Sequence, residues 1–263
     1  MTLTDSFLAL IISLFASAVG AICGIGGGVI IKPTLDLFGF ASVSTISFLS
    51  CCTVLSMSSY SVIRSLGSEI KIDFKISTPL AVGASVGGVL GSLLFKAAGA
   101  LFEDPNRVGI TQAICLAAVT AGTLLYTLFK DKVEHLNVKG ALPCVLIGLI
   151  LGVISSFLGI GGGPINLAVL FFFFGMQTKV AAANSLYIIL FSQSANLLTT
   201  VIGGVPVFEW HALVFMIAGG IGGGVIGRAV NKRIPSKGVD RLFTALMALI
   251  ILISIYNAVK YYL

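Results

Sequence analysis

The chain has 263 residues, of which 57% are hydrophobic and only 10% are charged, and its mean hydropathy is +1.08. Soluble domains carry about 25% charged residues, so this chain cannot cover a water-facing surface with polar groups and is not a soluble globular enzyme. Intrinsic disorder is excluded as well, because disordered chains are poor in apolar residues. The composition predicts an all-α integral membrane protein that crosses the lipid bilayer several times.

The net charge of +6 comes from Lys and Arg residues that mostly lie in short segments between apolar runs. There they act as topology signals, and the sequence offers no basic surface interleaved with aromatic residues for nucleic acid. The five cysteines lie in apolar stretches with no CxxC pair and no nearby His. We therefore expect buried thiols, with no disulfide framework, metal site or cofactor.

Ten apolar runs follow one another along the chain, at about 5–23, 29–39, 44–63, 76–95, 108–129, 141–158, 164–175, 180–202, 212–229 and 242–259. Most have about 18–22 residues, enough for a helix to cross a hydrocarbon core of about 30 Å. Runs 29–39 and 164–175 are shorter and reach roughly half way. Because backbone groups in lipid must be satisfied internally, the long runs are predicted to be helices.

The sequence contains an internal duplication. The string Gly-Ile-Gly-Gly-Gly occurs at 24–28 and again at 159–163, an offset of 135. A second glycine pattern recurs at an offset of 136, in which Gly83, Gly87, Gly88 and Gly91 match Gly219, Gly223, Gly224 and Gly227. We interpret residues 1–135 as a first membrane repeat and 136–263 as a second, within one compact transmembrane domain.

Positive charges predict the topology of each repeat. If the first two runs of each half form a hairpin that returns to its starting side, twelve Lys and Arg residues lie on one side of the membrane and three on the other. If instead they form a single crossing, the division is seven to nine and gives no signal. The positive-inside rule favours the hairpin. It predicts basic loops in the cytoplasm, both termini outside, and two inverted repeats of a glycine-broken hairpin plus three transmembrane helices.

The two glycine strings predict breaks in the membrane helices. Glycine costs about 1 kcal/mol relative to alanine in a helix interior, so four in five residues favour an interruption that frees backbone groups. Such groups are tolerated at membrane depth only against protein or a water-filled cavity. A half-helix that follows points its N–H groups and dipole at the break and attracts anions. A structural hinge is the alternative. The candidate substrate-binding residues are Gly26, Gly27, Gly28, Gly161, Gly162 and Gly163.

Polar side chains inside apolar runs extend this candidate site. Lys32, about one turn beyond Gly28, is predicted to attract an anion, or else to pair with Asp36 or reach the interface. Asn166 lies beside Leu167, which aligns with Lys32. Further candidates for substrate contact, with interhelical hydrogen bonding as the alternative, are Ser47, Asn184, Ser185, Gln193 and Asn196.

At these motifs the sequence resembles the sulfite exporter family TauE/SafE, which is also grouped with sulfonate uptake permeases. The matching segments are Gly-Ile-Gly-Gly-Gly-Val-Ile-Ile-Lys-Pro at 24–33, Gly-Ile-Gly-Gly-Gly-Pro at 159–164 and Asn184-Ser185-Leu186. With the duplicated layout, the resemblance covers essentially the whole chain. It implies a transporter for small sulfur-containing anions such as sulfite, thiosulfate or organosulfonates. The first-half segment Thr45-Ile46-Ser47-Phe48 departs from the Asn184 motif.

The leading hypothesis is a secondary transporter in the cell membrane that binds a small sulfur-containing anion and alternates access between its repeats. Coupling to protons or another ion, and the oligomeric state, are left open. A passive anion channel and a thiol-assisted sulfur carrier that uses Cys23 are the alternatives. An enzyme is not expected, because His-Glu-x-x-His and Gly-x-Ser-x-Gly are absent and neither His lies in a spanning run.

Overall fold

The computed structural model describes residues 3–68, 70–101, 105–158 and 162–262. The described residues form ten α-helices and one 3-10 turn: α1 (Leu3–Cys23), α2 (Gly28–Phe38), α3 (Val43–Leu66), α4 (Phe74–Leu101), α5 (Pro105–Phe129), η1 (Lys130–Lys132), α6 (Ala141–Phe157), α7 (Gly163–Phe174), α8 (Thr178–Gly203), α9 (Trp210–Arg233) and α10 (Ser236–Tyr262). Each predicted apolar run is one helix, and several helices extend a turn or more beyond the run. The prediction of an all-α integral membrane protein is confirmed.

Within the described residues, seven helices are long and apolar enough to cross a membrane, namely α1, α3, α4, α5, α8, α9 and α10. α6 has 17 residues, and the two half-length helices α2 and α7 have 11 and 12. Each half-length helix ends where glycine adopts a left-handed conformation, with φ of 66° at Gly39 and 60° at Gly175. Glycine reaches this region without the steric cost that a side chain adds. The sequence Phe-Gly, which occurs at 38–39 and again at 174–175, therefore ends each half-length helix.

The second glycine pattern allows close packing between helices, as its spacing of small residues predicts. A Cβ atom at Gly83, Gly87 or Gly91 of α4 would collide with backbone atoms of α6, at Val145, Leu149 and Val153. A Cβ atom at Gly219, Gly223 or Gly227 of α9 would collide in the same way with α1, at Leu10, Leu14 and Ala18. The two sets of contacts are related by the repeat, because the contacted residues differ by 135 and the glycines by 136.

These contacts also give the directions of the helices. Residue numbers rise together along both pairs, so α1 is parallel to α9 and α4 is parallel to α6. α4 begins near the start of α8, where the Asp73 N–H donates to Asn184 Oδ1 at 2.8 Å. α9 ends near the start of α8, where Arg228 and Lys179 line one cavity. α4 and α9 therefore run in opposite directions, and so do α6 and α1. This supports the prediction of inverted repeats.

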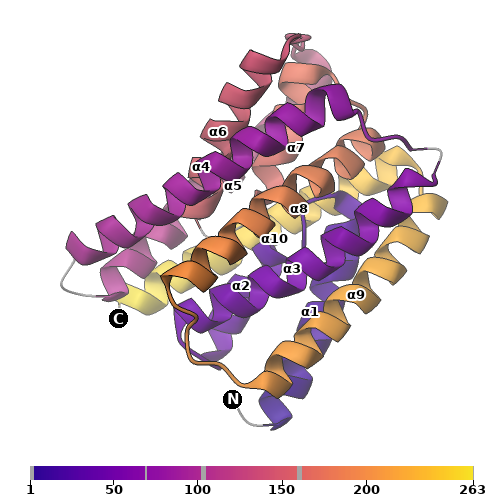
Figure 1. Ribbon diagram of the computed structural model, residues 1–263. Coiled ribbons are helices and arrows are strands. Elements are labelled where there is room, and N and C mark those ends of the chain that lie inside the picture. Colours follow the sequence, from indigo (N-terminus) through magenta and orange to yellow (C-terminus); the bar gives the residue numbers. More distant parts are fainter. Residues whose placement is uncertain (1–2, 69, 102–104, 159–161, 263) are drawn as a thin grey trace.

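Figure 1 shows the long helices running from the lower left to the upper right of the view, with both ends of the chain at the lower left. α2 returns toward that end, because Lys260 Nζ of α10 donates to the Leu37 carbonyl at 3.0 Å. α1 and α2 therefore form the predicted hairpin. Which end faces the cytoplasm stays a prediction.

The glycine contacts predict a loss of stability when they are filled. Gly87→Leu and Gly223→Leu should each lower the thermal midpoint of the purified protein in detergent, because inserted side chains force two backbones apart at a cost of about 1–3 kcal/mol or more. Gly122→Leu is the matched control, since Gly122 is an exposed helical glycine with nothing within 4 Å of a built Cβ atom. Midpoints unchanged in the first two variants would contradict the proposed packing.

Candidate functional site

The first glycine string breaks the chain between α1 and α2. Gly24 and Gly26 have positive φ angles of 79° and 68°. The N–H groups of Gly24 and Ile25 both donate to the Gly20 carbonyl, at 2.8 and 3.0 Å, and α2 then opens with bonds to the Gly27 carbonyl. Among the described residues, the amides of 26–29 have no backbone acceptor. The break therefore presents unpaired N–H groups at the start of α2, as predicted.

This break is enclosed by protein from the end of α1 to the middle of the bundle. Gly24 packs so closely against Ala182 of α8 that a Cβ atom would overlap it. A Cβ atom on Gly26 would lie 3.3 Å from Val54 and 3.4 Å from Ile189, residues about halfway along α3 and α8. Gly27 faces Ser17 of α1, with Oγ 3.0 Å from a built Cβ atom. The break thus reaches the centre of the bundle.

The second break adjoins the first. Gly162 and Gly163 have φ angles of 102° and 21°, and Gly162 precedes the first residue of α7. A Cβ atom on Gly163 would collide with Val29 and would lie 3.7 Å from the Ile25 carbonyl oxygen. The N-terminal ends of the two half-length helices are therefore neighbours. Gly161 lies outside the described residues.

Three buried donors without a hydrogen-bond partner surround these breaks within the described part of the chain. They are Ser17 Oγ, Ser185 Oγ and Asn166 Nδ2, on residues that are 0%, 0% and 2% exposed. Ser17 faces Gly27, and the Asn166 amide lies against Gly162. Ser185 lies on α8 between Ala182 and Ile189, the two residues of that helix against which the first break packs. Together with the helix N-termini, these groups offer an anion uncharged donors and positive dipole ends.

Lys32 is 6% exposed and donates from Nζ to Gln112 Oε1 of α5 at 3.1 Å. Gln112 Nε2 in turn donates to the Phe157 carbonyl at 3.1 Å. The lysine is therefore tied to the last residue of α6, immediately before the second break. It shares a cavity of about 40 Å³ with Asp36, Gln112 and Leu158. No Lys32–Asp36 ion pair is found among the described residues, and Asp36 Oδ1 is buried without a partner.

The other predicted polar residues lie in different surroundings. Asn184 Oδ1 accepts from the Asp73 N–H at 2.8 Å and from Ser77 Oγ at 2.6 Å, and its Nδ2 donates to the Val180 carbonyl. It joins α8 to the start of α4. Asn196 Oδ1 accepts from Ser156 Oγ at 3.1 Å and Ser92 Oγ at 3.4 Å, which joins three helices.

Ser47 and Gln193 are not joined to the breaks by hydrogen bonds in the described part of the chain. Ser47 is half-buried in the second turn of α3, and the Gln193 side chain is buried on α8. The Gln193 backbone carbonyl accepts from Cys51 Sγ at 3.5 Å. Substrate contact by these residues, and by Asn184 and Asn196, stays a prediction.

Sequence reasoning missed Ser17 and Gln112 as members of this site. Ser17 follows Ser13 by four residues in an otherwise apolar run, and Gln112 is one polar residue near the start of α5, so neither belongs to the glycine patterns that the two halves share. It also missed a cavity of about 570 Å³, which Ala21 and Ala182 line beside the first break. Cavities depend on how side chains from distant helices meet, and no local signal marks them.

Comparison with known proteins identifies the family. A family model described as "Sulfite exporter TauE/SafE" matches residues 9–254, which is nearly the whole chain. The chain belongs to the TauE/SafE family. The resemblance drawn from the glycine motifs is confirmed, and TauE/SafE proteins are membrane transporters rather than enzymes.

Curated relatives agree with this assignment. The TauE/SafE chain is 24% identical over 275 aligned positions to "Probable membrane transporter protein YunE" of Bacillus subtilis (strain 168), covering 93% of this chain and 96% of the relative. It is 23% identical over 256 positions to YjnA of the same organism, with the same coverage. It is 29% identical over 188 positions to MamO of Magnetospirillum gryphiswaldense, covering 65% of this chain and 30% of that protein. No solved structure matches.

Proposed function

We propose that this TauE/SafE transporter is a secondary carrier of a small sulfur-containing anion, namely sulfite, thiosulfate or an organosulfonate. The anion is held where the two glycine breaks adjoin. One observation carries this proposal: two interrupted helices meet at the centre of the bundle, and buried donors without partners surround the meeting point. The repeats 1–135 and 136–263 alternate access to this point.

The physical case for an anion rests on what unpaired donors cost. A buried donor left without an acceptor costs about 1–3 kcal/mol, and most buried polar groups in proteins are paired. Ser17, Ser185 and Asn166 depart from that rule within one region of the described chain. An oxyanion has several acceptor oxygens and would pair these groups together with the free amides of the first break. A sulfite-sized dianion held mainly by neutral donors is also released more readily than one fully neutralised by side-chain charges.

Access differs between the two ends of the bundle, which favours a carrier over a passive channel. The cavity of about 570 Å³ lies at the end of the bundle that holds Arg228 and Lys179. Toward the opposite end, Thr45 Oγ1 of α3 donates to the Val207 carbonyl at 2.9 Å. Beside it the Phe48 and Phe208 rings pack with centroids 5.0 Å apart. We assign these contacts as a closure that opens when the carrier alternates.

The first prediction concerns the unpaired hydroxyl groups. Ser185→Ala and Ser17→Ala remove donors that bond to nothing in the protein, so the thermal midpoint should stay constant. The apparent KM for labelled sulfite or thiosulfate in proteoliposomes should rise about fivefold or more for each, the equivalent of about 1 kcal/mol. Thr120→Val is the control, because Thr120 Oγ1 on α5 is an equally buried, unpaired hydroxyl. Unchanged KM values in both serine variants would remove the break site from consideration.

A second prediction tests the charge on Lys32. Lys32→Gln retains a partner for Gln112 while removing the positive charge, so the fold should survive. The affinity for a dianion should fall about tenfold, because bonds to charged groups contribute about 1.5–3 kcal/mol. Binding of thiosulfate to the purified protein measures the change. An unaltered affinity with an unaltered thermal midpoint would leave Lys32 as a purely structural member of the Gln112 pair.

A third prediction tests the closure. In a background in which the five cysteines are replaced, Thr45→Cys and Val207→Cys are combined and bridged with a short reducible thiol reagent. Bridging should stop transport, and reduction should restore it, because the closure must open in every cycle. The single-cysteine variants treated in the same way are the controls. Transport that continues through the bridged protein would overturn the gate, and a cysteine-free background with full activity would remove the Cys23 thiol mechanism.

A further inference from the structure

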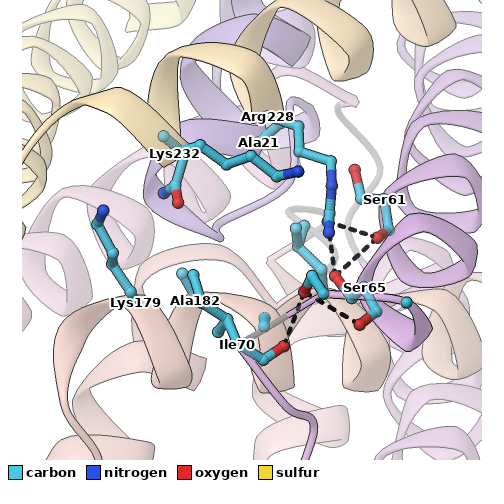
Figure 2. A pocket seen from close by; sticks show the side chains of 13 residues that line it. Ala21, Ser61, Ser65, Ile70, Lys179, Ala182, Arg228 and Lys232 are labelled. Carbon is cyan, nitrogen blue, oxygen red and sulfur yellow. Dashed lines mark hydrogen bonds between the residues drawn. The ribbon is translucent and has the colours of Figure 1, made fainter.

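The cavity of about 570 Å³ combines parts of the chain that are distant in sequence. It lies between the C-terminal ends of α1, α3 and α9, the start of α8 and the described residues of the α3–α4 loop. Figure 2 shows Lys179, Arg228 and Lys232 around this space, with Ser61 and Ser65 beside the guanidinium. None of the three buried donors of the break site lines it.

Arg228 is held in place by neutral groups. Its Nη1 donates to the Ser61 carbonyl at 3.0 Å and to Ser65 Oγ at 2.6 Å, and its Nη2 donates to the Arg64 carbonyl at 2.6 Å. All of these acceptors are uncharged, so the guanidinium is positioned without losing its charge. The Arg64 carbonyl belongs to the last turn of α3, where carbonyl groups lack a partner within the helix, and the Ser61 carbonyl accepts from Ser65 Oγ at 2.8 Å as well.

Lys179 and Lys232 also lack an acidic partner in the described part of the chain. Neither takes part in an ion pair or a side-chain hydrogen bond there. Another lysine toward the same end differs, since Lys130 Nζ pairs with Asp240 Oδ1 at 2.7 Å. No described residue that lines the cavity is acidic; Glu69 lies outside the described residues. Three cations that have no acidic partner among the described residues surround one concave space, and together they create a positive potential that concentrates small anions.

The cavity and the first break lie on opposite sides of the same few residues. Ala21, Ala182, Ala183 and Leu186 line the cavity, and Ala182 is the residue against which Gly24 packs. Asn231, also in the lining, donates from Nδ2 to the Ile22 carbonyl near the end of α1 at 2.6 Å. An anion in the cavity is therefore separated from the break by the Gly24–Ala182 contact.

The duplication does not account for these charges. At the offset of 136, Arg228 corresponds to Ser92 and Lys232 to Lys96. At the offset of 138, which aligns Ser47 with Ser185, Lys179 corresponds to Ala41. The first half thus has one cation where the second has three. Because topology signals need only be near the end of a helix, their convergence on one cavity calls for a different explanation.

We propose that this basic cavity is a second anion-binding site, separate from the glycine breaks, which takes up a small dianion of the thiosulfate or sulfite type before it moves past Gly24. The proposal rests on the proposed transport function. Lys179 and Lys232 bind the anion directly, and Arg228 supplies a fixed positive charge. The site raises the local anion concentration at the break, and it lies at the end of the bundle that holds Arg228.

The experiment measures the binding of ³⁵S-thiosulfate to the purified protein in lipid-free detergent by equilibrium dialysis. The wild type should bind two anions per chain. One of them should bind weakly, with an affinity that falls as the ionic strength rises. Lys179→Gln/Lys232→Gln should lose the weak, salt-sensitive anion, keep the other, and keep its thermal midpoint, because neither lysine makes a bond in the fold. Its apparent KM in proteoliposomes should rise at least threefold at unchanged maximal rate.

The matched control is Lys139→Gln/Lys237→Gln, which removes two exposed cations that do not line the cavity. It should retain both anions. Equal losses in the two double variants would mean that net charge alone attracts anions and would overturn the site. A wild type that binds one anion, lost in Ser185→Ala but kept in Lys179→Gln/Lys232→Gln, overturns the cavity site and keeps the break site. If no anion binds and none is transported, the proposed function fails as well.

A lipid headgroup has the same anionic chemistry as the solute, and the two are separated in a further arm. Phosphatidylglycerol added to the micelles should compete weakly or not at all with the salt-sensitive anion, since the cavity is proposed for a free solute. If the Lys179→Gln/Lys232→Gln variant loses binding of phosphatidylglycerol but never of thiosulfate, the ligand is a lipid and the proposal is overturned.

Discussion

Hydrocarbon supplies no partners for backbone N–H and C=O groups, and this constraint governs both where the chain is helical and where it is not. Ten helices satisfy it by internal bonds. The first glycine break meets it differently, because its free amides are shielded from lipid by protein: Gly24 packs against Ala182 and Gly27 against Ser17. An interruption at this depth needs a tight wall of neighbouring helices. α1 forms part of this enclosure. Its position depends on close contact with α9, which requires glycine at positions such as Gly223.

The two glycine patterns therefore have complementary roles. In the faces that pair α1 with α9 and α4 with α6, the missing side chain lets backbones meet while the helices stay regular. In the breaks, the missing side chain permits positive φ, as at Gly26, and leaves amides without acceptors. The packing glycines stabilise the enclosure, and the glycines of the breaks leave free hydrogen-bond donors inside it. A chain with only the packing glycines would be a stable bundle with no place for a polar solute.

The sequence predicted those features that depend on periodicity and on backbone cost. Run lengths fixed the helices, and the spacing of Gly83 and Gly219 predicted a packed face. The hydrogen-bond partners of individual polar side chains could not be predicted from the sequence, because they depend on which helix lies opposite. Lys32 was expected to attract an anion, to pair with Asp36 or to reach the interface, and in the structure its Nζ bonds to Gln112, 80 residues away. Asn184 was expected at the site, and its amide is bonded to the start of α4.

The two halves share a backbone plan but differ in charge, and the difference decides the chemistry. Lys32 corresponds to Leu167, so only one half-helix places a cation in the bundle interior. Arg228 corresponds to Ser92, so the second half has an arginine at a position where the first half has a serine. Duplication alone would yield a carrier with equal affinity at its two faces. The affinities of a carrier do not alter the equilibrium distribution of its solute, so such asymmetry changes only the concentration at which each face loads. Under the proposed mechanism, the residues that break the repeat set the concentration at which each face loads, and the residues that keep the repeat allow the two halves to alternate.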